Sequence, residues 1–403
     1  MRKLFKRFIK NHNEYIEIKI GDYCSDKKVL IIFPHNVILR KNGVQQRFYS
    51  LIRYLNSRGF SVDLFSHTNY VDKWENIGDY NKEGIVRKIF LYDFNKIRGI
   101  IRNRDLPDFG NSTLRKVIQE IVMKENYGYV IVSYVMWANL VSDINENVKK
   151  VLMVEDFISV NHYLRYKGNY NLGRSIEDEI KRMLLFDVAI FISKSEYEFF
   201  KNVLRNVKCY WVPHFLMIEE EDIFPNFNYK NKKNDLIFVG SDNPFNNEGI
   251  IWFLNSIYMK LSKDYSLIVV GGVNKYLNKY RSRYNNKNVS FIEYINDLYS
   301  LYLKSKVAIC PMLSGTGLKV KIIEYLFFGL PVVSTPIGFS GMPGDYNSGC
   351  ILTQDENEFK DALEHLLNNE KLYEEYSRKA REYYMYYFQK DKAFKVLDKI
   401  FVK

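Results

Sequence analysis

Short apolar runs alternate with helical patterns along the first part of the chain. Residues 28–34, KVLIIFP, are apolar and rich in β-branched side chains, which is typical of a strand buried in a parallel sheet. Apolar residues in 44–56 recur at helical spacing, Gly59 ends that helix, and residues 61–66 have the pattern of the next strand. A strand, a helix and a second strand in this order predict the start of a doubly wound sheet.

The alternation continues through the rest of the chain. Further strands are predicted at residues 129–134, 150–154, 188–192, 209–213, 235–240, 266–271, 289–292, 307–311 and 331–335, and further helices at 176–186, 196–205, 248–261, 295–305 and 319–328. Residues 219–234 interrupt it, because they are polar and lack periodicity, which indicates a domain boundary. The predicted fold class is therefore α/β, with Rossmann-like domains at 1–215 and 216–385 that face a cleft, a favoured place for a ligand.

Composition narrows the class of protein. A hydrophobic content of 47% with 21 Gly and 9 Pro favours a well-folded chain over a disordered one. The net charge of +12 suits an anionic partner, such as nucleic acid, a phosphate-bearing ligand or a membrane, although a solvated basic surface explains it equally well. The four cysteines are scattered, which favours a reducing, cytoplasmic compartment over a disulfide framework.

The first twelve residues are basic and amphipathic. Four apolar side chains share one face of a predicted helix: Leu4, Phe5, Phe8 and Ile9. Such a helix can lie on an anionic bilayer or pack its apolar face on the domain, and both alternatives stay open. No signal peptide is recognisable, and prolines interrupt the longest uncharged run, residues 325–344. We expect a cytoplasmic protein, either free or in peripheral contact with the inner face of the membrane through residues 1–12.

A glycine-rich loop follows the strand predicted at 307–311. Gly315 and Gly317 permit backbone conformations and close approaches that a Cβ would block. The next helix begins with free N–H groups and a partial positive charge, so the loop can hold a phosphate. Lys319 and Lys321 add full positive charges that can neutralise a diphosphate.

Glu324 lies one helical turn beyond Lys321, close enough for a salt bridge. Alternatively, its carboxylate accepts hydrogen bonds from ribose hydroxyls, as acidic residues do in other nucleotide-binding folds. The spacing from Gly315 to Thr335, G-x-G-x-K-x-K-x-x-E-x-x-x-x-G-x-P-V-V-x-T, resembles the nucleotide-binding signature of glycosyltransferase family 4, whose members have the GT-B fold. The resemblance favours the ribose role for Glu324 and implies that Thr316 belongs to the same donor site.

Other segments are similar to the same family over nearly the whole chain. Gly240 resembles the opening of its C-terminal domain, and Gly43 with Arg47 resembles its N-terminal glycine loop, which in the family approaches the donor phosphates. Residues 380–388 are similar to the helix that leads back to the N-terminal domain. The resemblance therefore implies a C-terminal helix, at about 386–403, that completes the first domain.

The chain departs from the family at three places. Many members have a glutamate at the position of Thr316, and that glutamate contacts the donor sugar. Its replacement here leaves the identity of the donor sugar undetermined. Residues 241–249 lack the Arg and Lys that bind the diphosphate in many members, so the two lysines of the following motif or the backbone must supply that charge. The glycine pair of the N-terminal loop is reduced to Asn42 and Gly43.

The resemblance implies transfer of a sugar from a nucleotide-sugar donor to an acceptor hydroxyl, with retention of configuration. The acceptor would be a glycan or a lipid-linked glycan in the synthesis of a bacterial surface polysaccharide or glycolipid. Fixed N–H groups and lysines can stabilise the leaving diphosphate. No two aspartates are separated by one residue, so we expect no divalent metal and no cofactor.

Three polar residues follow the strand predicted at 150–154: Glu155, Asp156 and, in the same loop region, His162. Each could act as a base or orient the acceptor hydroxyl. A helix cap is the alternative for Asp156, and a structural role is the alternative for His162 and for His35, which follows the first strand. A retaining enzyme would require no protein base.

Three other functions stay open. A non-hydrolysing sugar-nucleotide epimerase shares the architecture but would need carboxylates near the donor sugar, where Thr316 offers none. The charge and the 32 tyrosines permit a nucleic-acid-binding protein, but the basic residues are dispersed and no nucleic-acid motif is present, so we expect no nucleic-acid partner. A catalytically inactive homologue that acts as a partner subunit would fit the missing glutamate.

Overall fold

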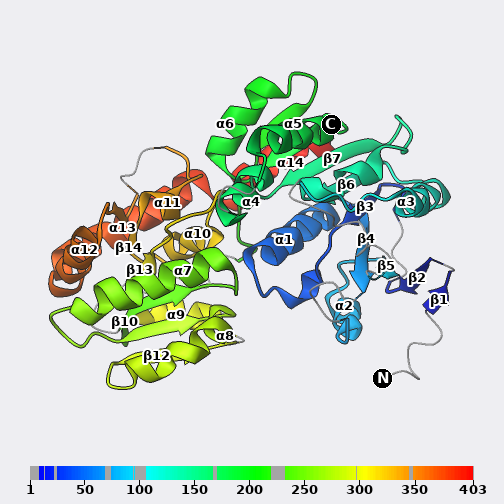
Figure 1. Cartoon of the computed structure of the whole chain (residues 1–403). Helices are drawn as coiled ribbons and strands as arrows, with labels where there is room; N and C mark the ends of the chain where they lie inside the picture. The colour runs from blue at the N-terminus through cyan, green and yellow to red at the C-terminus, as the bar shows by residue number, and fades with distance from the viewer. Residues whose placement is uncertain are drawn as a thin grey trace. The chain divides into compact units, whose positions relative to one another are not determined.

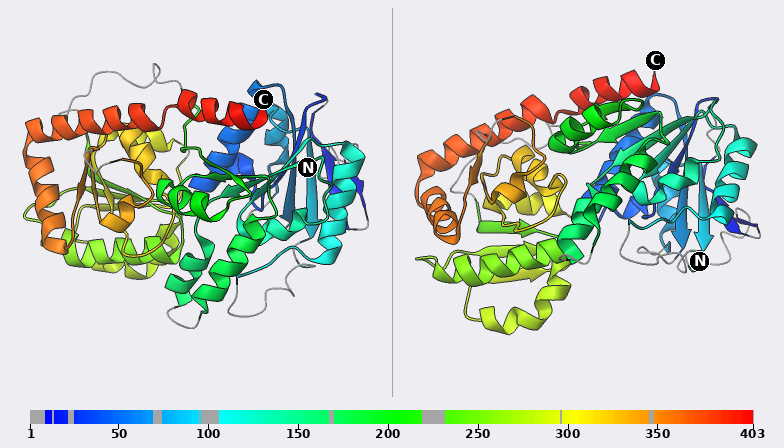
Figure 2. Two further views of the ribbon diagram at one scale, coloured as in Figure 1. Left: turned by 90° about the horizontal axis from the view of Figure 1, so that it is seen from above. Right: turned by 45° about the horizontal axis from the view of Figure 1, so that its top comes forward.

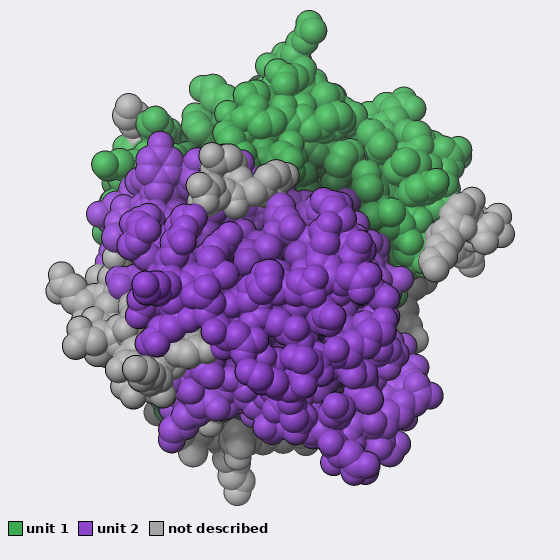
Figure 3. Space-filling view, turned by 90° about the vertical axis from the view of Figure 1, so that its left-hand side faces the viewer, with its two compact units in different colours: residues 1–212, 394–403 green, residues 213–393 purple. Residues whose placement is uncertain are grey.

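The computed structural model describes residues 9–12, 14–21, 25–68, 74–93, 95, 106–166, 170–218, 232–295, 297–344 and 348–402. The chain divides into two compact units, which Figure 3 colours separately: residues 1–212 with 394–403 form unit 1, and residues 213–393 form unit 2. Unit 2 therefore extends beyond residue 385, where the sequence predicted its end. Each unit is built on one sheet.

The sheet of unit 1 has nine described strands in the order β1-β2-β5-β4-β3-β6-β7-β8-β9 (Figure 1). Their bounds are β1 Ile9–Asn11, β2 Tyr15–Lys19, β3 Lys28–Ile32, β4 Ser61–Thr68, β5 Lys88–Asp93, β6 Tyr129–Ser133, β7 Lys149–Val154, β8 Val188–Phe191 and β9 Lys208–Trp211. The pairs β1–β2 and β2–β5 are antiparallel, and the other pairs are parallel. Strand order reverses around β3, as in a doubly wound sheet.

The α-helices of unit 1 cover this sheet. They are α1 Gly43–Ser57, α2 Ile77–Glu83, α3 Ser112–Glu125, α4 Ile158–Tyr166, α5 Leu172–Met183, α6 Lys194–Val203 and most of α14 Lys390–Phe401. The α14 helix, red at the C-terminus in Figure 2, joins this unit. It does so through aromatic contacts, since the rings of Phe394 and Phe401 lie 4.9 and 6.3 Å from that of Tyr54 on α1. Asp398 adds hydrogen bonds from the Tyr54 hydroxyl at 2.8 Å and the Arg58 guanidinium at 2.7 Å.

The sheet of unit 2 has six described strands, all parallel, in the order β12-β11-β10-β13-β14-β15. The strands are β10 Asn234–Val239, β11 Leu267–Val270, β12 Val289–Ile292, β13 Ser305–Cys310, β14 Val332–Ser334 and β15 Cys350–Leu352. The α-helices are α7 Pro244–Trp252, α8 Val273–Leu277, α9 Leu298–Lys304, α10 Val320–Phe327, α11 Pro336–Phe339, α12 Glu356–Asn368 and α13 Glu370–Tyr387. Strand order reverses around β10, so the loops after β10 and β13 meet at the carboxyl edge of the sheet.

The predicted α/β class is confirmed, and most predicted elements lie within a few residues of their observed positions. The loop predicted around His162 is wrong, because His162 lies in α4. The first N–H groups of α4, those of Ile158 and Ser159, donate to the buried carboxylate of Glu179 on α5 at 3.0 and 2.8 Å. A cap supplied from another helix leaves no local signal in the sequence.

The amphipathic helix predicted for residues 1–12 lies mostly outside the described residues. Where the chain is described, Ile9–Asn11 forms β1 and pairs with β2, so the helical prediction is wrong there. The pairing supplies partners to backbone groups that a helix would have satisfied internally. No helix in the described part of the chain is both long and apolar enough to cross a membrane.

Candidate functional site

The glycine loop after β13 requires both of its glycines. Gly315 has φ 110° and Gly317 has φ 73°, a region that side chains with a Cβ rarely adopt. A Cβ on Gly315 would also come within 3.4 Å of the Phe245 ring on α7. The hydroxyl of Ser314 donates to Oε2 of Glu248 on α7 at 3.0 Å, so two side chains of α7 help to fix the loop.

Lys319 stabilises this loop through hydrogen bonds from its side chain. Its ammonium donates to the carbonyls of Thr316 and Gly317 at 3.0 Å each, and to the hydroxyl of Ser340 at 3.2 Å. An ammonium has three N–H donors, so these three bonds are enough to occupy them. Lys319 therefore fixes the shape of the loop, which the sequence did not predict.

Lys321 is held differently. Its Nζ donates to Oδ1 of Asn246 at 2.8 Å and lies 4.3 Å from the centroid of the Phe238 ring. Asn246 in turn donates to the carbonyl of Ser241 at 3.0 Å. Burial lowers the pKa of Lys321 to about 8. Lys321 is thus partly buried, mainly charged at neutral pH, and tied to the loop after β10.

Glu324 lies on the inner side of α10 with 8% of its surface exposed. Its Oε2 accepts a hydrogen bond of 2.6 Å from the hydroxyl of Tyr302 on α9. Burial raises the pKa of Glu324 to about 7, although the Tyr302 hydroxyl and the charge of Lys321 act in the opposite direction. The salt bridge considered between Lys321 and Glu324 does not occur among the described residues, where the polar partners are Asn246 and Tyr302 respectively.

Glycines also bring neighbouring loops of unit 2 into contact. A Cβ on Gly271 would lie 2.4 Å from the carbonyl oxygen of Gly240, and one on Gly249 would lie 2.4 Å from that of Pro311. The loops after β10 and β11 therefore pack backbone to backbone, and helix α7 packs in the same way against the loop after β13. This edge carries every residue that the sequence predicted for the donor site of the second domain: Gly240, Gly315, Thr316, Gly317, Lys319, Lys321 and Glu324.

The same part of the chain matches a known family. Residues 233–369 match the family model of glycosyl transferases group 1. They form a glycosyl transferases group 1 domain. The predicted class of enzyme, a glycosyltransferase, is thereby confirmed.

The match covers only part of the chain, but more extensive similarities exist. A protein of Klebsiella pneumoniae, described as an uncharacterized 44.6 kDa protein in a cps region, is 25% identical over 373 residues, which are 85% of this chain and 91% of that protein.

Solved structures confirm the GT-B fold. Anabaena Alr3699/HepE in complex with UDP and glucose has a TM-score of 0.68 at 12% identity, over 93% of this chain and 99% of that one. A mutant of S. aureus TarM, in complex with Fondaparinux, alpha-GlcNAc-glycerol and UDP, has a TM-score of 0.67 at 12% identity, over 94% and 100%. WaaG, a glycosyltransferase involved in lipopolysaccharide biosynthesis, has a TM-score of 0.63 at 14% identity, over 93% and 98%.

In unit 1 the structure joins two residues that the sequence named separately. Nη1 of Arg47 on α1 donates to Oε2 of Glu155 at 2.8 Å and to the carbonyl of Val154 at 3.3 Å. Both side chains are buried. Burial raises the pKa of Glu155, and the Arg47 charge opposes this effect. Glu155 therefore anchors the first turns of the helix that Gly43 begins.

The other residues predicted in unit 1 lie on or before helix α4 and after strand β3. His162 lies on α4 beside the rings of Tyr166 and Tyr170, at 5.7 and 5.8 Å between centroids, and burial lowers its pKa. Asp156 is half-buried in the segment between β7 and α4. His35, after β3, lowers the pKa of Glu155 through its charge, in opposition to the effect of burial.

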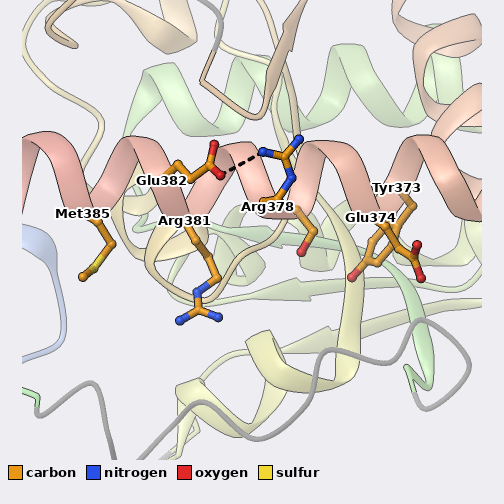
Figure 4. Close-up of a pocket in the computed structure, with 7 residues that line it drawn as sticks. Tyr373, Glu374, Arg378, Arg381, Glu382 and Met385 are labelled. Carbon is orange, nitrogen blue, oxygen red and sulfur yellow. Dashed lines mark hydrogen bonds and ion pairs between the residues drawn. The ribbon is translucent and has the colours of Figure 1, made fainter.

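A hollow of about 460 Å³ lies beside α13 (Figure 4). The described residues that line it are Tyr373, Glu374, Ser377, Arg378, Arg381, Glu382 and Met385. None of them is a predicted site residue, and Arg378 is ion-paired with Glu382 at 2.8 Å. Over the described ranges, no three His, Cys, Asp or Glu side chains are grouped so that they could hold a metal ion.

Proposed function

We propose that the chain transfers a sugar from a nucleotide-sugar donor to an acceptor hydroxyl in the synthesis of a bacterial surface polysaccharide or glycolipid. The observation that carries the proposal is the carboxyl edge of unit 2 within the group 1 domain, where the loop after β10 packs on the loop after β11, and helix α7 packs on the glycine loop after β13. N–H groups of residues 315–317, the start of α10 and the ammonium of Lys321 stabilise the diphosphate as it gains negative charge on leaving.

The residues of this edge have separate roles in the proposal. Glu324 accepts hydrogen bonds from the ribose, and Lys321 supplies the nearest positive charge. Lys319 acts indirectly, because it holds the loop in the shape that presents Thr316 and its neighbours. Gly240 permits the close approach of the backbone to the donor.

Unit 1 supplies the acceptor site. Of the three candidates, Asp156 and His162 retain a role in contacting the acceptor hydroxyl, supported by their position at or beyond the carboxyl end of β7. We assign Glu155 a positioning role, because its Oε2 is bonded to the Arg47 guanidinium and the whole side chain is buried. Retention of configuration is part of the proposal, and it requires no protein base.

The reaction needs no divalent metal, since N–H groups and Lys321 supply the positive charge. Turnover in EDTA should equal turnover without it. Complete loss of turnover in EDTA, with recovery on addition of manganese, would contradict this part of the proposal.

The biological setting is proposed from the relatives. The Klebsiella pneumoniae relative lies in a cps region, and WaaG is involved in lipopolysaccharide biosynthesis. Both support a glycan or lipid-linked glycan acceptor. The proposal also includes a cytoplasmic location and peripheral contact of residues 1–12 with the inner face of the membrane, which rest on the basic, amphipathic sequence of those residues. Wild-type protein should then cosediment with vesicles of anionic lipid more than a variant that lacks residues 1–12.

A thermal-shift screen tests the donor assignment. UDP-, GDP-, ADP-, dTDP- and CMP-sugars are compared, because a ligand at a hundred times its Kd stabilises the fold by about 2.7 kcal/mol. The sugar nucleotide that raises Tm should lose most of its effect in Glu324→Gln. Conversion without an acceptor would indicate an epimerase instead, and binding without any turnover would indicate an inactive partner subunit.

A further inference from the structure

The two oxygens of the Glu324 carboxyl group have different surroundings. The hydroxyl of Tyr302 donates to Oε2 at 2.6 Å, and both side chains are buried. Among the described residues no hydrogen bond reaches Oε1 of Glu324, although 8% of the residue remains exposed. One oxygen is therefore fixed from within unit 2, and the other is left to a ligand.

Tyr302 is itself rigidly placed. Its ring lies 5.5 Å from that of Tyr325 in an edge-to-face arrangement and 5.2 Å from that of Phe328, both centroid to centroid. Tyr302 is 0% exposed, so its hydroxyl cannot turn to water. A donor held in this way sets the plane of the carboxyl group that it contacts.

We propose that Tyr302 is a positioning residue for the donor nucleotide: it holds one oxygen of Glu324 so that the other receives the ribose hydroxyls. The inference deepens the proposed function and rests on it, since it assumes that a ribonucleotide occupies this edge of unit 2. It also explains why, among the described residues, the hydrogen-bond partner of Glu324 is an aromatic hydroxyl and not a cation: the carboxylate form keeps its charge available to the ligand.

The test compares ribonucleotides with analogues that lack both ribose hydroxyls. UDP, GDP and ADP are titrated calorimetrically into the protein, each beside its 2′,3′-dideoxy counterpart. The wild type should prefer the ribonucleotide that it binds by on the order of tenfold, since charge-assisted hydrogen bonds are lost with the hydroxyls. In Tyr302→Phe that preference should fall towards one, with little change in affinity for the dideoxy form.

The preference should also depend on pH. A ribose hydroxyl donates to the carboxylate form, so the preference should grow as pH rises through about 7, the pKa of Glu324. The groups that face this carboxyl are Tyr302 on α9, Lys321 on its own helix, and Tyr325, whose own pKa Glu324 helps to raise. Loss of the Tyr302 hydroxyl should move the transition to higher pH. Protonation of the diphosphate itself cancels in the ratio of the two affinities.

Tyr258→Phe is the matched control. Tyr258 is a buried tyrosine of the same unit whose hydroxyl donates to the carbonyls of Tyr265 and Asn288 at 2.6 and 3.2 Å. Its loss should lower stability and leave the ribose preference unchanged. In Glu324→Gln the preference should already be lost, and adding Tyr302→Phe should change it little.

Two outcomes distinguish a failure of this inference from a failure of the proposed function. A Tyr302→Phe protein with the wild-type ribose preference and pH dependence would overturn the inference alone. A wild-type protein that binds no nucleotide would overturn the proposed function, and the inference with it. If Tyr302→Phe does not fold, Glu324→Gln still decides, because a ribose preference in that variant equal to the preference of the wild type would contradict the proposal.

Discussion

Two buried glutamates, one in each unit, lie near the carboxyl ends of parallel strands and are held in opposite ways. Glu155 in unit 1 is bonded to a cation, the guanidinium of Arg47, at 2.8 Å. Glu324 in unit 2 is bonded to a neutral hydroxyl, that of Tyr302, at 2.6 Å. Burial raises the pKa of both carboxyl groups. The charge of the hydrogen-bond partner therefore decides whether each carboxylate can still bind a ligand.

A cation next to a buried carboxylate neutralises it and turns the pair into part of the scaffold. A neutral hydroxyl orients the carboxyl group but leaves its charge unsatisfied, so that a ligand can complete the site. By this criterion we expect Glu155 to be structural and Glu324 to bind a ligand. Three substitutions test this distinction.

The largest effect is expected from Arg47→Met. It leaves Glu155 buried without its cation, which costs about 3–5 kcal/mol of the free energy of unfolding. Urea unfolding followed by tryptophan fluorescence measures the loss, and a second substitution, Glu155→Met, should recover most of it because no buried charge remains. Wild-type stability in the single variant would show that the pair does not support the fold.

A smaller effect is expected from Glu324→Gln, and it depends on pH. The folded pKa of about 7 exceeds the ordinary value of 4.5, so Glu324 contributes stability that is full below pH 4.5 and is lost as pH rises through 7. The loss is on the order of 3 kcal/mol in the wild type. Melting temperatures from pH 4.5 to 8 should therefore fall less steeply in Glu324→Gln. Parallel curves for the two proteins would contradict the assignment of this titration to Glu324.

The smallest effect is expected from Lys319→Met, which extends the comparison to the cations of unit 2. The loop loses three hydrogen bonds to a charged group at its half-exposed surface, so stability should fall by roughly 1–2 kcal/mol. Affinity for UDP should fall less than in Lys321→Met, whose ammonium is the proposed phosphate contact. An unchanged melting temperature with a large loss of UDP affinity would instead place Lys319 directly on the diphosphate.

The sequence located the glycine loop of unit 2 better than the contacts that stabilise it. Gly315, Gly317 and Lys321 could be identified because a glycine loop between a strand and a helix is a local pattern. The pair Arg47–Glu155 spans 108 positions, and Tyr302 reaches Glu324 from a different helix, so neither pairing leaves a periodic signal.

The structural elements that the sequence did not predict also depend on contacts between residues that are distant in the sequence. β1 and β2 are short strands at one side of the unit 1 sheet, and both contain polar residues: β1 has one apolar residue of three, and a glutamate interrupts the apolar residues of β2. The start of α4 depends on Glu179, which lies 20 positions from Ser159 in the sequence. Such contacts follow from tertiary packing, which overrides local preference.

The attachment of α14 to unit 1 has a consequence for biosynthesis. Tyr54 and Phe60 pack against aromatic residues that follow the whole of residues 213–393, with Phe60 6.2 Å from Phe401 between ring centroids. At roughly 5–20 residues per second, translation reaches that segment on the order of ten seconds or more after unit 1 has been made. During that interval the nascent chain exposes an aromatic surface on α1. A trigger-factor-type chaperone that binds near residues 54–60 would protect it until the final helix is synthesised.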